Sequence, residues 1–130
     1  MSGYGIKKKV NLAYDDAVAK VTETLKSEGF GVLTTIDVKA TLKAKLDVDF
    51  KRYVILGACN PKLAHRALTE ENDVGLLLPC NVVVHETEDG GSVVAAIDPK
   101  AMLSVTGRAD LEPLAEEVKA RLARAIENVA

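Results

Sequence analysis

The sequence contains no tryptophan and no glutamine, only two cysteines, and aromatic side chains at 4% of its 130 residues. So few aromatic rings argue against a surface that stacks the bases of single-stranded nucleic acid. The basic and acidic side chains nearly balance, at 17 against 19, which gives a formal net charge of −2. Because proteins that bind nucleic acid or anionic membranes present an excess of Lys and Arg, we expect neither partner.

Long hydrophobic runs are missing as well. No stretch approaches the roughly 20 apolar residues that a membrane-spanning helix needs. The basic segment 7–9 is not followed by the apolar region that would mark a secretory signal. We therefore expect a cytoplasmic protein, in which Cys59 and Cys80 remain thiols rather than forming a disulfide.

The length and composition that are present are those of a globular protein. The hydrophobic fraction is 48% and the charged fraction is 28%, as in soluble domains. A chain of this length can bury a core without disulfides or metal. No repeat, low-complexity tract or Pro/Ser-rich linker divides it, so we expect residues 1–130 to form a single domain.

Residue patterns predict an α+β fold. Alternating or β-branched segments bounded by turns predict strands, and helical spacing of apolar residues predicts helices. The expected strands are residues 5–12, 30–38, 51–59, 74–78, 82–88 and 92–97, and the expected helices are residues 15–28, 39–46, 60–71 and 111–129, with a short turn or helix at residues 98–103. The Asp89-Gly90-Gly91 turn predicts a hairpin, and hairpins pair antiparallel. We therefore expect a mainly antiparallel sheet with helices packed on one face.

The helix starts carry capping signals. Asp15 or Asp16 is expected to cap the first helix, Asn60 followed by Pro61 the third, and Asp110 the last. The last helix has the clearest pattern, because its apolar residues form one continuous stripe that must be buried. The stripe comprises Leu111, Leu114, Ala115, Val118, Leu122, Ala125, Ile126 and Val129.

Two short segments form a candidate site. Each places Cys-Asn at the end of an apolar strand beside a proline. Cys59 is expected just before a helix N-terminus, where backbone N–H groups and the helix dipole favour a thiolate or a small anion. The candidate ligand or thiol site therefore comprises Cys59, Asn60, Pro61, Pro79, Cys80 and Asn81.

Several interpretations of these residues stay open. Each cysteine fits a small buried hydrophobe at a strand end, with Asn60 acting only as a cap. A second interpretation is a reactive thiol at Cys59 with Cys80 as its resolving partner. A third is a small-ligand or anion pocket, in which Asn60 and Asn81 orient polar groups of the ligand. A metal site is disfavoured because zinc prefers four ligands and only two Cys and two His are present, so we expect no metal and no cofactor.

Neither the histidines nor any known catalytic motif indicates a reaction. His65 is expected at the exposed margin of its helix, and His85 on a half-exposed strand face beside Val83. The sequence has no Ser-His-Asp order, P-loop or dinucleotide-binding fingerprint. It therefore leaves any catalytic residue unknown.

Several segments together resemble one protein family. The clearest runs from Gly57-Ala58-Cys59-Asn60-Pro61 to Val82, with further similarity at residues 35–42 and at Asp98-Pro99. These segments resemble the "domain of unknown function 302" family, and the similarity covers nearly the whole chain. The resemblance implies a β-α-β(4)-α arrangement, similar to the TATA-box-binding-protein-like fold class, and a homodimer. It implies no DNA binding, and the family has no established reaction.

The first functional hypothesis is therefore a small, dimeric binding or structural module with a small-ligand pocket near Cys59 and Cys80. The alternative is a thiol-dependent enzyme or redox protein that uses Cys59 with Cys80. A metal carrier is the third hypothesis.

Overall fold

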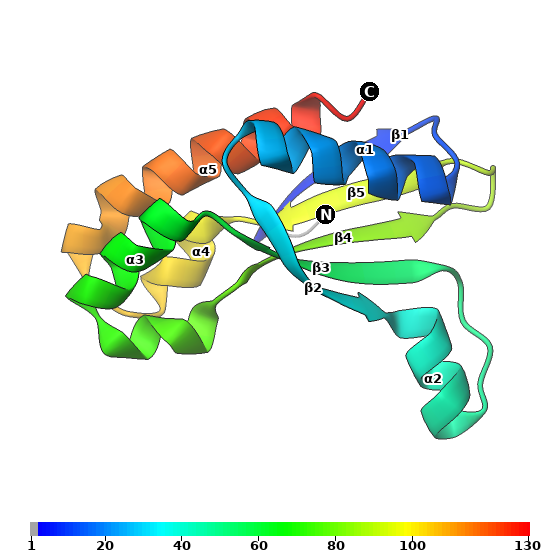
Figure 1. The fold of residues 1–130 in the computed structure, drawn as a ribbon, viewed down its shortest axis with the longest axis horizontal. Coiled ribbons are helices and arrows are strands. Elements are labelled where there is room, and N and C mark those ends of the chain that lie inside the picture. Colours follow the sequence, from blue (N-terminus) through cyan, green and yellow to red (C-terminus); the bar gives the residue numbers. More distant parts are fainter. Residues whose placement is uncertain (1–2) are drawn as a thin grey trace.

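The computed structural model describes residues 3–130 and contains a five-stranded sheet with helices packed against it (Figure 1). The strands are β1 (Gly5–Val10), β2 (Gly31–Asp37), β3 (Tyr53–Cys59), β4 (Cys80–Glu86) and β5 (Ser92–Ile97). The helices are α1 (Tyr14–Ser27), α2 (Val38–Leu46), α3 (Pro61–Glu70), α4 (Pro99–Ser104) and α5 (Glu112–Glu127), with 3₁₀ helices η1 (Asn72–Leu77) and η2 (Ala109–Leu111). The sheet order is β1-β5-β4-β3-β2, and all neighbours are antiparallel. The predicted α+β fold with a mainly antiparallel sheet is confirmed.

Helices α1 and α5 cover one face of this sheet (Figure 1). Leu25 of α1 and Leu122 of α5 are completely buried, as are Val82 and Val94 on the strands beneath them. The predicted apolar stripe of the last helix is buried along its whole length. Removing such aliphatic side chains from water stabilises the fold by about 1.5–3 kcal/mol each.

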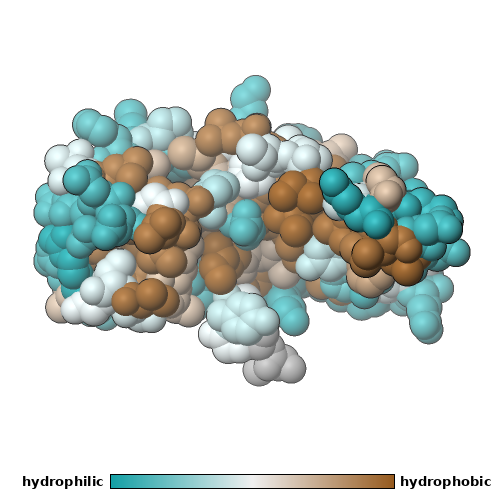
Figure 2. Space-filling model, turned by 90° about the horizontal axis from the view of Figure 1, so that it is seen from below, coloured by the Kyte–Doolittle hydropathy of each residue, from teal (hydrophilic) through white to brown (hydrophobic). Residues whose placement is uncertain are grey.

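The opposite face of the sheet has no helix packed over it and carries both apolar and polar side chains. The strand register places Ile36, Ile55, Val83, Ala95 and Lys7 in one row across all five strands. We call this surface the open sheet face. Helices α1 and α5 both lie on the other side, and Figure 2, which looks at the molecule from below, shows groups of apolar side chains here with polar ones between them.

One predicted strand is wrong. Residues 74–78 do not extend but fall largely within the 3₁₀ helix η1. The Glu71 side chain accepts a bond from the Asp73 N–H at 3.4 Å and holds the first turn. Val74 is buried while Leu76 is 85% exposed, so the apolar run is not a buried strand. The strand starts only after Pro79, which has no N–H to donate to a ladder.

Two predicted caps are also wrong. No side chain caps α1, which begins after Ala13. Asp15 and Asp16, either of which was expected to cap this helix, lie in its first turn. Asp110 lies in η2 and pairs with Arg108, so α5 begins at Glu112 with Pro113 in its first turn. Among residues 3–130, no helix is both long enough and apolar enough to cross a bilayer.

Candidate ligand pocket

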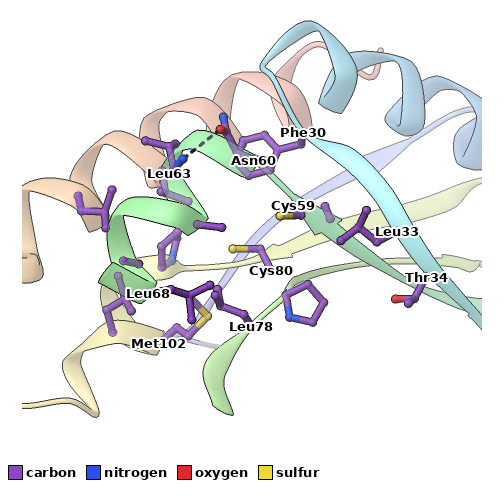
Figure 3. Close-up of a pocket in the computed structure, with 18 residues that line it drawn as sticks. Phe30, Leu33, Thr34, Cys59, Asn60, Leu63, Leu68, Leu78, Cys80 and Met102 are labelled. Carbon is purple, nitrogen blue, oxygen red and sulfur yellow. Dashed lines mark hydrogen bonds between the residues drawn. The ribbon is translucent and has the colours of Figure 1, made fainter. Parts of the chain in front are cut away.

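The structure brings together the two Cys-Asn segments that the sequence singled out. Strand β3 ends where the antiparallel strand β4 begins, and the register pairs Ala58 with Cys80 and Gly57 with Asn81. Cys59 is therefore the next residue along β3 from the partner of Cys80. Figure 3 shows both cysteine side chains among the residues that line one pocket.

A glycine permits the close packing of these strand ends. A Cβ atom at Gly57 would lie 2.9 Å from Cγ of Pro79 and closer still to Oγ1 of Thr34. Because real Cβ atoms do not approach other heavy atoms this closely, any larger residue would push the Pro79 ring or Thr34 away. Pro79 can therefore pack against β3 only because residue 57 is a glycine, which has no side chain.

Helix α3 starts at this same place. Oδ1 of Asn60 accepts a hydrogen bond from the Leu63 N–H at 3.3 Å, which confirms the predicted cap. Pro61 occupies the first helical turn, where its missing N–H would have no intrahelical partner. The cap directs the buried side of α3, with Leu63 and Ala67, toward the end of the sheet.

A cavity of about 290 Å³ lies between α3 and the end of the sheet. Its lining comes from elements that are far apart in the sequence: the start of β2, the end of β3, α3, the link between η1 and β4, α4 and α5. These elements contribute, among others, Phe30, Leu33, Leu63, Leu68, Leu78, Met102 and Val118. No Asp, Glu, Lys, Arg or His belongs to the lining among the described residues. The pocket is therefore apolar and uncharged.

The polar groups of the pocket are few and already engaged or neutral. Asn60 uses its carbonyl oxygen to cap α3. Burial, with a smaller contribution from nearby Cys59, raises the pKa of the Cys80 thiol to about 11. Cys80 is therefore protonated at neutral pH, and the pocket lining offers no base to activate either thiol.

The six predicted site residues separate into two groups. Cys59, Asn60, Pro79 and Cys80 line the pocket. Pro61 is exposed and does not belong to the lining. Asn81 is exposed on the open sheet face, next to Val83, because alternate residues of β4 point to opposite sides. The pocket lining therefore includes both thiols, but only one of the two asparagine side chains that were expected to orient a ligand.

Sequence reasoning missed the apolar part of the lining. Phe30, Met102, Leu114 and Val118 complete the pocket, yet they were predicted only as parts of a strand, of a short turn or helix, and of the last helix. Helical spacing marks such residues as buried but does not say which of them leave a space between them. Only the tertiary packing identifies them.

The histidines lie away from the pocket. His65 is exposed on α3, as expected. His85 lies on the open sheet face and stacks on Tyr53 with ring centroids 5.4 Å apart and planes 5° apart. Within residues 3–130, no group of three Cys, His, Asp or Glu side chains is arranged to hold a metal ion.

Comparisons with known proteins agree on one family. The profile described as "Domain of unknown function DUF302" matches residues 6–129. The crystal structure of an uncharacterized conserved protein DUF302 from Bacillus stearothermophilus superposes with a TM-score of 0.92 and shares 30% sequence identity. The match covers 99% of this chain and 100% of that one. No curated protein matches the sequence.

Proposed function

Because this chain belongs to the family described as Domain of unknown function DUF302, whose description names no activity, we propose its function from the pocket. The chain is a non-catalytic binding module. Its ligand is a small, uncharged, largely hydrocarbon molecule, or the hydrocarbon part of a larger one, held in the cavity between α3 and the end of the sheet.

The observation that carries this proposal is the lining of the cavity. Apart from Thr34 and Asn60, its residues are aliphatic, aromatic, proline, cysteine or methionine. A charged ligand would lose its hydration there without gaining a partner, which is strongly unfavourable. A hydrocarbon ligand would gain about 0.8 kcal/mol for each methylene group that it buries.

The same lining weighs against a thiol-dependent enzyme. A nucleophilic cysteine needs a neighbouring base or cation that stabilises its thiolate. Burial raises the pKa of Cys80 instead, to about 11. A resolving role for Cys80 would require it to react from the protonated, buried state.

The proposal is tested by titrating the protein with straight-chain alcohols of six to ten carbons, using the methyl NMR signals of the protein. We expect the affinity to rise about fourfold for each added carbon, which is the value that corresponds to one buried methylene group. Binding should also slow the alkylation of Cys59, which is partly exposed and lines the cavity.

Two substitutions on α3 provide a matched pair. Ala64→Phe adds a ring inside the pocket lining, and we expect it to abolish alcohol binding. His65→Phe adds a ring at the adjacent exposed position and should leave binding unchanged. Alcohol affinity that is independent of chain length, or equal in both variants, would show that the cavity is not the binding site.

A further inference from the structure

The sulfur-bearing side chains of residues 3–130 all lie at one cavity. The sequence has two cysteines and two methionines, and Met1 lies outside the described residues. The other three, Cys59, Cys80 and Met102, line the pocket between α3 and the end of the sheet. They come from three separate elements, namely the end of β3, the start of β4 and helix α4. Because the tertiary fold alone brings them together, no spacing in the sequence marks this cluster.

The two cysteines lie on neighbouring strands. Cys80 pairs with Ala58, so Cys59 is one residue beyond the partner of Cys80. With the usual spacings of a sheet, the Cα atoms of the two cysteines lie roughly 6 Å apart. In Figure 3 both thiol groups point the same way, from the strands into the cavity, and Cys80 is drawn between Cys59 and Met102. Since methionine has three rotatable bonds, the thioether of Met102 can turn toward the two thiols.

We propose that Cys59, Cys80 and Met102 form a binding site for copper(I). Two thiolates and one thioether are soft donors, and soft donors select Cu(I) among the biological metal ions. On binding, each cysteine releases its proton to solvent and its sulfur becomes a ligand of the metal. One Cu(I) ion with two thiolates leaves a single net negative charge, which is spread over the sulfur atoms.

The rest of the lining disfavours harder metal ions. Mg²⁺ and Ca²⁺ require oxygen ligands, above all carboxylates, and no Asp or Glu belongs to the lining among the described residues. Zn²⁺ takes four ligands in structural sites, and within residues 3–130 no His lines the cavity to add a fourth. Cu(I) is satisfied by two or three sulfur ligands, which is what the cavity supplies.

The surroundings of the sulfur atoms also suit a soft ion. A charged ligand without a partner would lose its hydration in this cavity, whereas Cu(I) exchanges its water for sulfur ligands. The apolar side chains around the site limit the access of water, which is one way in which proteins tune a metal. Cys59 and Met102 are partly exposed and Cys80 is buried, so an ion that enters from solvent meets Cys59 and Met102 before it reaches Cys80.

This inference goes beyond the proposed function. The sulfur atoms form one part of the cavity wall, and their use as metal ligands requires no hydrocarbon in the remaining space. It also differs from a site built of Cys, His, Asp and Glu, of which residues 3–130 contain no suitable group of three. Here the third ligand is the thioether of Met102.

The inference is tested by titrating the reduced, metal-free protein with Cu(I), supplied anaerobically as its acetonitrile complex. Competition with the chromophoric chelator bicinchoninate measures the affinity. We expect one tightly held Cu(I) ion per chain, and X-ray absorption spectra in which sulfur is the nearest neighbour of copper. Zn²⁺ added under the same conditions should not be retained, because the site lacks a fourth ligand.

Substitutions separate the sulfur atoms from other copper ligands. Cys59→Ala and Cys80→Ala should each lower the Cu(I) affinity more than about 100-fold, because the loss of a group that only orients a metal ligand already costs about 10- to 100-fold. Met102→Leu nearly conserves volume and removes only the thioether, and should lower the affinity about tenfold. The matched control is His65→Ala with His85→Ala, which removes both imidazoles, leaves the lining intact and should not change the affinity. Circular dichroism confirms folding.

The outcomes also separate this inference from the proposed function. A protein that retains no stoichiometric Cu(I), a Met102→Leu protein with full affinity, or nitrogen and oxygen as the nearest neighbours of copper would overturn the inference. Loss of Cu(I) binding in the histidine double variant would overturn it as well. Alcohol binding without Cu(I) binding would overturn the copper site alone, whereas Cu(I) binding without alcohol binding would overturn the proposed function alone.

Discussion

Gly57→Ala tests whether the strand ends beneath the pocket are packed as tightly as the structure shows. The new Cβ would lie 2.9 Å from Cγ of Pro79 and closer to Oγ1 of Thr34. Thr34 can rotate its side chain, but the proline ring is rigid, so the strands must shift. Overpacking of this kind lowers the free energy of unfolding by about 1–3 kcal/mol. For a chain of 130 residues this corresponds to a fall in Tm of about 4–11 °C.

The assay is urea and thermal unfolding followed by circular dichroism, since the chain has no tryptophan to report by fluorescence. Gly31→Ala is the matched control. It is also in a strand of the same sheet, but nothing lies within 4 Å of its added Cβ. We expect Gly31→Ala to be neutral or slightly stabilising, because alanine restricts the unfolded chain more than glycine does.

Equal stability of the Gly57→Ala and Gly31→Ala proteins would refute the packing argument. Thr34→Ala combined with Gly57→Ala should recover part of the loss, because it removes the nearer of the two contacts. A double variant as unstable as Gly57→Ala alone would assign the whole effect to Pro79.

Three further predictions concern the same end of the molecule. Asn60→Ala removes the cap bond to Leu63 and should lower the free energy of unfolding by about 1 kcal/mol, whereas Asn60→Asp should nearly retain it, as measured by urea midpoints. Partial burial of Asp98 raises the pKa of its carboxyl, but hydrogen bonds from Lys119 and from the N–H of Lys100 outweigh this effect and lower the pKa below 3.8. The stabilisation that Asp98 gives the fold is therefore complete above pH 3.8 and is lost as the pH falls further. Asp98→Asn should flatten this part of the stability–pH curve. Burial raises the pKa of Cys80 to about 11, so iodoacetamide at neutral pH should label Cys80 only in the unfolded chain. The stability of the fold should also decline as the pH rises above 9, which is the pKa of an unperturbed thiol. Rapid labelling of Cys80 in the native protein, read by mass spectrometry, would contradict this.

Local signals in the sequence were sufficient for most of the fold. The stripe that includes Leu114, Val118 and Leu122 predicted the final helix, and all three side chains are buried. Asn60 followed by Pro61 predicted the start of α3, and the cap bond is present. These signals work because periodicity and capping depend on residues within one element.

The errors arise where tertiary structure decides. The apolar run at residues 74–78 is short, and a short run fits a strand or a helical turn equally well by pattern. Pro79 ends the run and η1 forms instead. Asn81 was assigned to the pocket because it follows Cys80, yet a shift of one residue along a strand moves a side chain to the opposite face.

The sequence singled out the two Cys-Asn segments because each was expected at the end of a strand, but only Cys59 ends a strand, whereas Cys80 begins β4. The nature of the site did not follow from the sequence either. Cysteine and asparagine drew attention to polar chemistry, whereas the cavity is defined by Phe30, Met102 and their apolar neighbours. No local sequence motif marks an apolar cavity, because the cavity forms where buried side chains from different elements leave space between them.

Intermolecular NOEs between octanol and the methyl groups of the protein test the central claim most directly. We expect contacts from octanol to Leu63 and Met102, which line the cavity from α3 and α4. Contacts only to Val83 and Val93 on the open sheet face, or no contacts at all, would contradict an apolar ligand site between α3 and the end of the sheet.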